Sequence, residues 1–156
     1  MQQVLKNTPV NFIWFRIFSC YGPGDNDHWF LNYLIKSLLS GNNPKVSKGE
    51  QVWNYIHIDD LISLILKSIL SKNKNGIFNV GSNQNLKLKL IMEYVKNQIC
   101  PDKALDYGSY PYRKDQVMRL VPDITKAKKE FNWMPKIDIF QGLDELIDFY
   151  KKNENN

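Results

Sequence analysis

The feature that most constrains the fold is an apolar run near the start of the chain, from Val10 to Phe18, interrupted only by Asn11 and Arg16. A strand that is apolar on nearly every residue and rich in aromatic and β-branched side chains is typical of the interior of a parallel sheet, where both faces are covered. Such a strand needs neighbouring strands and helices, and the nine residues before it cannot supply them. We therefore expect this chain to be the C-terminal part of a larger α/β protein, with aromatic surface at Phe12, Trp14 or Phe15 left exposed.

Beyond this run, strand and helix patterns alternate, which indicates an α/β fold of mixed strands and helices. Asp59 or Asp60 is expected to cap the helix that follows, and because that helix is apolar almost all round we expect it to be buried. Asp123 or Thr125 is expected to cap a later, short helix. Residues 1–150 are interpreted as one structural unit, 101–122 as a loop, and 151–156 as a frayed polar tail. The strands are predicted at 10–18, 51–58 and 77–80, and the helices at 30–39, 61–70, 86–99, 124–131 and 139–150.

Composition excludes several classes of protein. The 156 residues are 43% hydrophobic and include only two cysteines, Cys20 and Cys100, so a disulfide scaffold is excluded and a reducing, cytoplasmic location is expected. No run of about 20 apolar residues predicts a membrane span, and no signal peptide is evident. The net charge of +5 comes mostly from lysines spread along the chain, which favours a solvated surface over a nucleic-acid groove.

Several chemical motifs are absent from the sequence. It contains no G-x-G-x-x-G and no G-x-x-x-x-G-K-[ST], so it brings no phosphate-cradling loop of its own. It also lacks H-E-x-x-H, C-x-x-C and G-x-S-x-G, and with only His28 and His57 no metal site is expected. Tyr110 and Lys114 match the string Tyr-x-x-x-Lys, but Pro111 argues against the helix on which that pair would have to lie.

Four segments carry more information than the rest. The first is a Tyr-Gly-Pro-Gly turn at 21–24, placed after the buried strand at the sheet edge where open α/β folds bind ligands. The second and third segments, 53–61 and 76–82, each end a strand with polar residues. Taken alone, the second is explained by a strand followed by a helix cap, and the third by a strand followed by a turn. In the fourth, Arg113 stands among tyrosines in a lysine-dominated chain, which favours bidentate recognition of an anion.

In this order the segments resemble the C-terminal half of the NAD-dependent epimerase/dehydratase family, the extended short-chain dehydrogenases/reductases that act on nucleotide sugars. The resemblance extends from about Val10 to Tyr150. It implies a Rossmann-like fold whose Gly-rich NAD loop and catalytic Tyr-x-x-x-Lys pair would lie upstream, so no catalytic residue is assigned in this chain. The matching motifs are Arg16…Tyr21-Gly22-Pro23-Gly24, Tyr55-Ile56-His57-Ile58-Asp59-Asp60, Phe78-Asn79-Val80-Gly81-Ser82, Arg113, and Asp123-Ile124-Thr125-Lys126-Ala127…Trp133-Met134-Pro135.

The resemblance also implies site residues. Phe18, Ser19 and Tyr21 correspond to the turn that faces the nicotinamide end of the cofactor, NAD or NADP. The family usually has Asn at the position of Ser19, and many members have a diphosphate-binding arginine at the position of Trp53, where a tryptophan would instead stack on a base or sugar. The residues that the resemblance assigns to the nucleotide sugar are Ser19, His28, Trp29, Trp53 and Arg113.

The function implied is the nucleotide-sugar-binding portion of an NAD(P)-dependent nucleotide-sugar epimerase, dehydratase or 4-ketoreductase, serving polysaccharide synthesis and inactive alone. The alternative is a non-catalytic module that binds sugar nucleotides or a protein partner. The expected ligand is a nucleotide sugar, and neither nucleic acid nor membrane is an expected partner. A homodimer and a complementing N-terminal half are the protein partners to consider.

Overall fold

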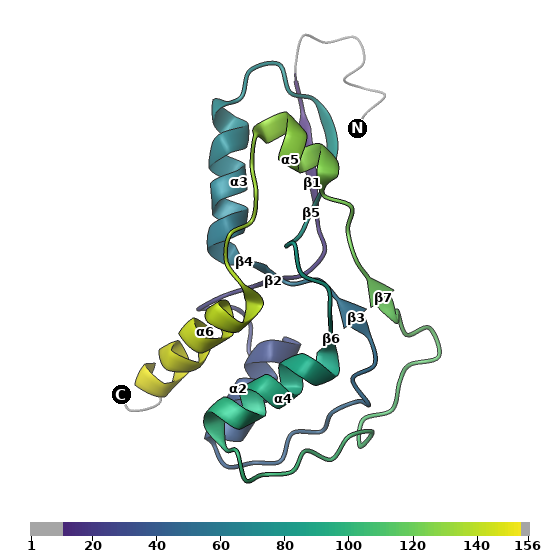
Figure 1. The fold of residues 1–156 in the computed structure, drawn as a ribbon, viewed down its shortest axis with the longest axis vertical. Helices are drawn as coiled ribbons and strands as arrows, with labels where there is room; N and C mark the ends of the chain where they lie inside the picture. The colour runs from purple at the N-terminus through teal and green to yellow at the C-terminus, as the bar shows by residue number, and fades with distance from the viewer. Residues whose placement is uncertain (1–10, 154–156) are drawn as a thin grey trace.

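The computed structural model describes residues 11–153, and Figure 1 shows its elements. The chain alternates short strands with helices, as the sequence predicts, and forms one long parallel strand pair beside a group of three helices. Helix α6 continues to Asn153, so the predicted polar tail begins inside a helix, and residues 154–156 lie outside the described part. The elements are β1 (Ile13–Ile17), β2 (Cys20–Tyr21), α2 (Phe30–Leu39), β3 (Val52–Trp53), β4 (Ile56–His57), α3 (Ile58–Leu70), β5 (Gly76–Val80), β6 (Leu86–Lys87), α4 (Leu88–Ile99), β7 (Arg119–Leu120), α5 (Thr125–Phe131) and α6 (Ile139–Asn153).

Strands β1 and β5 form the parallel pair, with Ile13 opposite Gly76 and Ile17 opposite Val80. The predicted start of this strand at Val10 lies outside the described residues. Phe15 points to a core shared with α3 and α5, where its ring lies 6.0 Å from that of Phe131. Trp14, on the opposite face, is 49% exposed. Within the described residues the strand is therefore covered on one face only, and the expected exposed aromatic surface is confirmed at Trp14.

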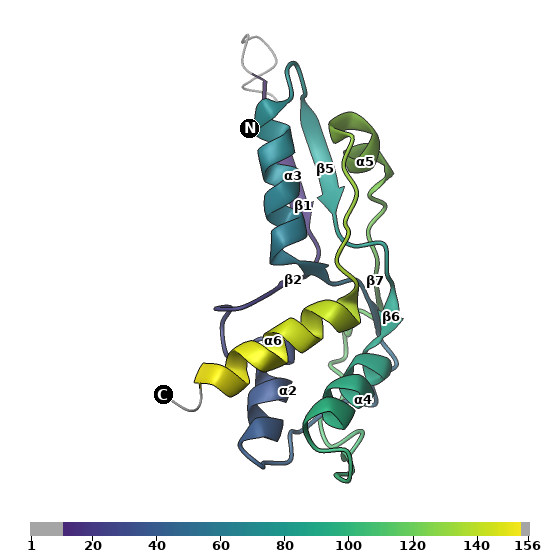
Figure 2. The same cartoon turned by 60° about the vertical axis from the view of Figure 1, so that its left-hand side comes forward.

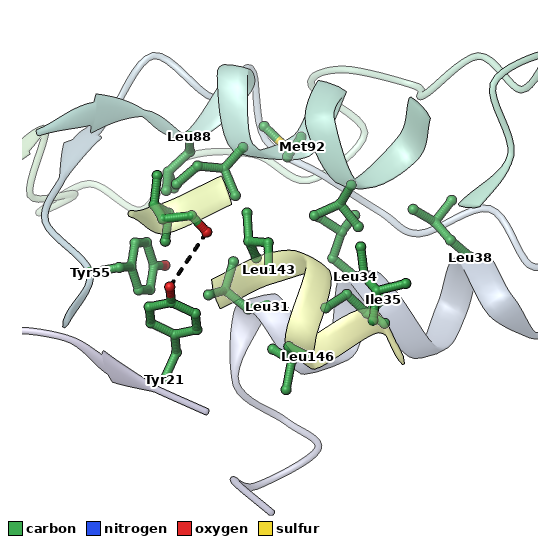
Figure 3. Close-up of a cluster of buried hydrophobic side chains, with 14 of the residues drawn as sticks. Tyr21, Leu31, Leu34, Ile35, Leu38, Tyr55, Leu88, Met92, Leu143 and Leu146 are labelled. Carbon is green, nitrogen blue, oxygen red and sulfur yellow. Dashed lines mark hydrogen bonds between the residues drawn. The ribbon is translucent and has the colours of Figure 1, made fainter. Parts of the chain in front are cut away.

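The second core lies between α2, α4 and α6, which pack together in the lower part of Figure 1. Apolar side chains recur along each helix at the spacing that faces one side, as expected for amphipathic helices. Leu34 from α2, Met92 from α4 and Leu143 from α6 are fully buried there. Figure 3 shows that Tyr21 and Tyr55 lie at one end of this cluster. The two tyrosines thus connect the helical core to the strands.

The strand predicted at 51–58 is interrupted at Asn54. Its first part, β3, pairs antiparallel with β6 and parallel with β7, whereas its second part, β4, pairs parallel with β2. The buried amide of Asn54 causes the break, because it accepts a hydrogen bond from Ser82 N at 2.7 Å and donates to the oxygen atoms of Ser82 and Gln84 at 3.0 and 2.9 Å. Strand β7 also occupies part of the segment expected to be a loop.

Helix α3 begins one turn earlier than predicted. His57 caps it, since its Nδ1 atom accepts the backbone N–H of Asp59 at 3.3 Å, so the prediction that Asp59 or Asp60 caps this helix was wrong. Burial all round was also wrong, because Ile69 is 73% exposed. At α5 the N-cap residue is Ile124, which makes no side-chain capping bond, so the prediction that Asp123 or Thr125 caps this helix was also wrong. Asp123 Oδ1 instead accepts the N–H of Thr125, the first residue of the helix, at 2.9 Å. No helix within residues 11–153 is long and apolar enough to cross a membrane.

Candidate functional site

A pocket of about 520 Å³ opens where β1 ends and the chain turns through β2 into α2. In open α/β folds the carboxyl ends of parallel strands are where ligands bind, and this pocket lies at that end of β1. Strand β3 and the start of α3 complete its wall. The residues that line it are Ile17, Phe18, Ser19, Cys20, Tyr21, Gly22, Pro23, Gly24, Asp25, Trp29, Phe30, Leu31, Asn32, Trp53, Tyr55 and Ile58.

The Tyr-Gly-Pro-Gly turn fits its place because two of its positions exclude side chains for different reasons. A Cβ at Gly22 would collide with the side chain of Ile58, so only glycine lets the turn pack against α3. Gly24 has φ +82°, a left-handed conformation that residues with a Cβ adopt at a cost. The turn therefore holds the strand end and the following helix in fixed positions around the pocket.

Aromatic rings form much of the pocket wall. Trp53 and Tyr55 lie two residues apart, with their ring centroids separated by 6.2 Å. The indole N–H of Trp53 donates to the carbonyl of Val117 at 3.3 Å, which ties the wall to the loop before β7. Trp29 is 63% exposed and stands at the rim. Indole faces offer stacking surface to a planar base or to the apolar face of a sugar.

Tyr21 lies between the pocket and the helical core. Its hydroxyl donates to the carbonyl of Ile139 at 3.4 Å, as the dashed line in Figure 3 shows, and its ring meets that of His57 edge-on at 5.2 Å. Burial raises the pKa of the Tyr21 hydroxyl above its ordinary value, and the carboxylate of Glu145 adds to this shift. Tyr21 therefore stays protonated at neutral pH and is positioned as a hydrogen-bond donor and packing group.

His57 is buried against the far side of the Tyr21 ring. Its Nε2 atom has no hydrogen-bond partner among the described residues, although Glu145 Oε2 lies 3.9 Å away. Because His57 is not among the residues that line the pocket, it supports the floor through Tyr21 rather than facing a ligand.

The polar groups at the strand end are already engaged. The hydroxyl of Ser19 donates to the carbonyl of Phe18 at 2.8 Å, and the carbonyl of Ser19 accepts the N–H of Ile56 at 2.8 Å. Burial, with a smaller contribution from Asp25, raises the pKa of the Cys20 thiol to about 11. Since the thiolate is the nucleophile, Cys20 is not poised for covalent chemistry near pH 7.

The pocket carries little charge. Asp25 is the one charged side chain among the residues that line it, and no lysine or arginine is among them. No group of three or more His, Cys, Asp or Glu side chains within residues 11–153 could hold a metal ion. The described walls thus suit stacking and hydrogen bonding better than direct neutralisation of phosphate groups.

Five of the predicted site residues meet in this pocket, and two do not. His28 is exposed and binds Asn26 Oδ1 through its backbone N–H at 2.9 Å, outside the lining. Arg113 is exposed in the loop whose Val117 contacts Trp53, and it does not line the pocket either. The Tyr-x-x-x-Lys string at 110–114 is not helical, as its proline predicted. The predicted residues that line the pocket are Phe18, Ser19, Tyr21, Trp29 and Trp53.

Sequence reasoning missed several lining residues, among them Tyr55 and Asn32. The strand period of two would have placed Tyr55 on the same face as Trp53. The sequence contains weaker evidence for Asn32: it is a polar residue within the apolar repeat of a helix. Its side-chain amide donates to the carbonyl of Asn26 at 3.1 Å and holds the turn against the helix.

Strands β1 and β5 are parallel, helix α3 lies between them in the chain, and the pocket opens at the end of β1. This arrangement defines a Rossmann-like α/β fold. Solved structures share it. UDP-glucose 4-epimerase of Thermotoga maritima, determined with UDP-glucose, superposes with a TM-score of 0.87 at 22% identity, over 98% of this chain and 50% of that chain. dTDP-glucose 4,6-dehydratase of Bacillus anthracis, determined with NAD, superposes with a TM-score of 0.76 at 26% identity, over 92% of this chain and 45% of the other.

The family follows from the sequence match. The model of the NAD dependent epimerase/dehydratase family matches residues 2–81, and this chain belongs to that family. CDP-abequose synthase of Salmonella typhimurium is 28% identical over 145 residues, which are 88% of this chain and 48% of that enzyme. UDP-glucuronic acid decarboxylase 1 of Arabidopsis thaliana is 26% identical over 87% of this chain and 31% of its own length. The chain therefore spans about half or less of the curated relatives it matches.

Proposed function

We propose that this chain is the nucleotide-sugar-binding portion of an NAD(P)-dependent epimerase, dehydratase or 4-ketoreductase, and that it is inactive on its own. The observation that carries the proposal is the pocket at the carboxyl end of β1, where the Tyr-Gly-Pro-Gly turn meets Trp53 and Tyr55. Family membership and the nucleotide-sugar names of the relatives support this reading. The role of the chain is to bind and orient the sugar, which lowers a barrier by positioning.

The roles divide along the pocket. Phe18, Ser19 and Tyr21, at the end of β1 and in β2, face the sugar and the nicotinamide end of the cofactor. Trp29 and Trp53, from the start of α2 and from β3, supply stacking faces for the base or the sugar. A base stacked on an aromatic side chain gains roughly 1–3 kcal/mol, so each tryptophan would contribute part of the binding free energy.

His28 and Arg113 are proposed as contacts made from outside the pocket wall. His28 immediately precedes the rim residue Trp29. Arg113 belongs to the loop that reaches Trp53 through Val117, and its planar guanidinium can contact two phosphate oxygens at once. In this arrangement the diphosphate would extend out of the pocket, whose lining has no cationic side chain, toward that loop.

The described residues do not fit a complete NAD site. The sequence has no Gly-rich phosphate loop, and the pocket has no cationic lining residue. NAD would therefore be held mainly by residues outside this chain. It follows that the purified chain should contain no stoichiometric NAD and should show no hydride exchange with a nucleotide sugar.

Calorimetric titration of the full chain with UDP-, dTDP- and CDP-glucose tests the proposal. We expect saturable 1:1 binding of at least one of these compounds. Trp53→Ala and Trp29→Ala should each weaken it about fivefold to a hundredfold, the equivalent of about 1–3 kcal/mol. Trp14→Ala is the matched control, because Trp14 is exposed but does not line the pocket. Equal affinities for all three variants would contradict the proposed site.

A further inference from the structure

We propose that Asn75 is a site of spontaneous deamidation, in which the backbone nitrogen of Gly76 attacks the side-chain amide of Asn75, and that the pairing of β1 with β5 slows this reaction. Water is the only co-reactant and no enzyme is needed. The reaction does not involve the pocket, so it is independent of whether the chain binds a nucleotide sugar.

Asn75 and Gly76 form the only Asn-Gly pair in the sequence. A side chain on the residue after an asparagine obstructs the approach of its backbone nitrogen to the asparagine amide, and glycine has no side chain. Three other asparagines follow within ten residues, and each precedes a residue with a side chain. They are Asn79 before valine, Asn83 before glutamine and Asn85 before leucine.

The Asn-Gly pair lies in the turn between α3 and β5. In Figures 1 and 2 this turn is at the end of the molecule where β1 begins. The side chain of Asn75 is exposed, so the water that the reaction consumes has access to it. Gly76 has φ +118°, a conformation in which a residue with a Cβ is strained. The turn therefore requires glycine at the position that makes Asn75 reactive.

Phe12, immediately before β1, holds both reacting groups. Its carbonyl accepts the N–H of Gly76 at 2.8 Å, and its own N–H donates to Oδ1 of Asn75 at 3.4 Å. A backbone nitrogen whose hydrogen is bonded to a carbonyl is hindered from losing that hydrogen, so the attack waits until the contact with Phe12 opens. Contacts at the end of a strand open more readily than contacts in a core. Pairing of β1 with β5 therefore slows the reaction without preventing it.

The bonds that form and break balance without an oxidant or a reductant. The nitrogen of Gly76 loses its proton and bonds to Cγ of Asn75, the bond from Cγ to the side-chain nitrogen breaks, and that nitrogen leaves with the proton as ammonia. The product is a five-membered succinimide. Water then adds to one of its two carbonyls, which opens the ring to aspartate or to isoaspartate, in which the main chain runs through the former side chain.

Isoaspartate at position 75 would disturb the strand pair. It adds one methylene group to the main chain directly before β5, where Gly76 is paired with Ile13 as the first residue pair of the two strands. The added length moves the N–H of Gly76 away from the carbonyl of Phe12. The modification thus weakens the same end of the strand pair whose opening allows it to form.

Incubation of the full chain in mildly alkaline buffer, followed by tryptic digestion and mass spectrometry, tests the proposal. Cleavage after Lys74 and Lys87 yields one peptide that contains Asn75 and the three later asparagines, which serve as matched internal controls. We expect Asn75 to be converted about tenfold faster than any of the three, with isoaspartate among the products. Unfolding the chain in guanidinium chloride should raise the rate at Asn75 about threefold or more.

Two further measurements complete the test. The Asn75→Gln variant, which cannot form the five-membered ring, should remain unmodified at this position over the same incubation. The isoaspartate form carries one additional negative charge and can be separated by ion exchange. Its Gly76 amide should exchange hydrogen faster than that of the unmodified chain.

Four outcomes would overturn the inference. Conversion of Asn75 no faster than that of the three later asparagines would show that it is not a preferred site. Aspartate without isoaspartate would mean direct hydrolysis instead of attack by Gly76, and so would equal conversion in the Asn75→Gln variant. Equal rates at Asn75 in the folded and unfolded chain would show that strand pairing does not control the reaction. Unchanged exchange of the Gly76 amide in the isoaspartate form would contradict its effect on the strand pair.

Discussion

The carboxylate of Asp60 accepts a hydrogen bond from the backbone N–H of Ile137, 2.9 Å away and 77 residues later in the chain. The same carboxylate accepts the N–H of Lys136 through both oxygens, at 3.0 and 2.9 Å. Asp60 is buried at the start of α3, so these bonds fix where the segment leading into α6 crosses that helix. Because α6 carries Gly142 against Tyr21, the placement of the pocket floor depends on this aspartate.

Asp60→Asn should destabilise the fold. The amide keeps the size of the side chain but is neutral and has one acceptor oxygen in place of two, so the N–H groups of Lys136 and Ile137 both lose their charged partner and one of them faces an NH₂ group. The expected loss is about 1.5–3 kcal/mol in the free energy of unfolding, measured by urea denaturation. Asp59→Asn is the matched control, because its side chain is 68% exposed, and it should change stability by less than about 0.5 kcal/mol. Equal losses for the two variants would refute this role.

Gly142→Ala should loosen the contact between α6 and the pocket floor. An added Cβ would collide with the hydroxyl of Tyr21, and overpacking of this kind costs about 1–3 kcal/mol, whereas alanine in a free helix position gains up to about 1 kcal/mol over glycine. We therefore expect a net loss of stability, reduced in a Tyr21→Phe background that removes the hydroxyl. A stabilised Gly142→Ala variant in the native background would contradict the packing described.

Cys20 should react slowly with iodoacetamide at neutral pH. Its thiol keeps its proton to a higher pH than a free cysteine does, because burial and then Asp25 raise its pKa to about 11. The rate of alkylation, followed by mass spectrometry of the Cys20 peptide, should rise about tenfold per pH unit between pH 8 and 10. A bound nucleotide sugar should slow it further, since Cys20 lines the pocket. Alkylation at the rate of free cysteine at pH 7 would show that the site is not as described.

Arg113→Lys should weaken binding of the nucleotide sugar although it keeps the charge. A guanidinium can contact two phosphate oxygens, and a single lost charge-assisted bond is worth about 1.5–3 kcal/mol, or about tenfold to a hundredfold in affinity. Arg119→Lys is the control, as an exposed arginine in β7 with no assigned ligand contact. The measurement is calorimetric titration, and identical affinities for wild type and Arg113→Lys would mean that Arg113 is an ordinary surface residue.

The parallel strand pair and most helices could be predicted from periodicity, because their apolar spacing reflects which face is buried. The break at Asn54 could not, since it depends on hydrogen bonds to residues 82–84, which no local pattern reveals. The cap of α3 was also missed. Asp60 has the residue type of a cap, but a distant segment uses its carboxylate, and His57 takes the cap.

The site, too, could be predicted only where its residues belong to local sequence motifs. Ser19, Tyr21 and Trp53 belong to contiguous motifs, and the fold brings those motifs together. His28 and Arg113 belong to a turn and a loop, whose orientation is not determined by spacing. The exposed aliphatic side of α3 shows a further limit: an apolar pattern indicates that a surface is to be covered, but not which part of a protein covers it.

Binding of a nucleotide sugar in the pocket is tested most directly by a titration of the 15N-labelled chain, followed through its four tryptophan indole N–H signals. Trp29 and Trp53 line the pocket, whereas Trp14 and Trp133 do not. We expect saturable shifts of the Trp29 and Trp53 signals with at least one of UDP-, dTDP- and CDP-glucose, and no change in the signals of Trp14 and Trp133. Titrations in which none of these compounds moves the Trp29 and Trp53 signals, or in which only Trp14 or Trp133 responds, would contradict binding in this pocket.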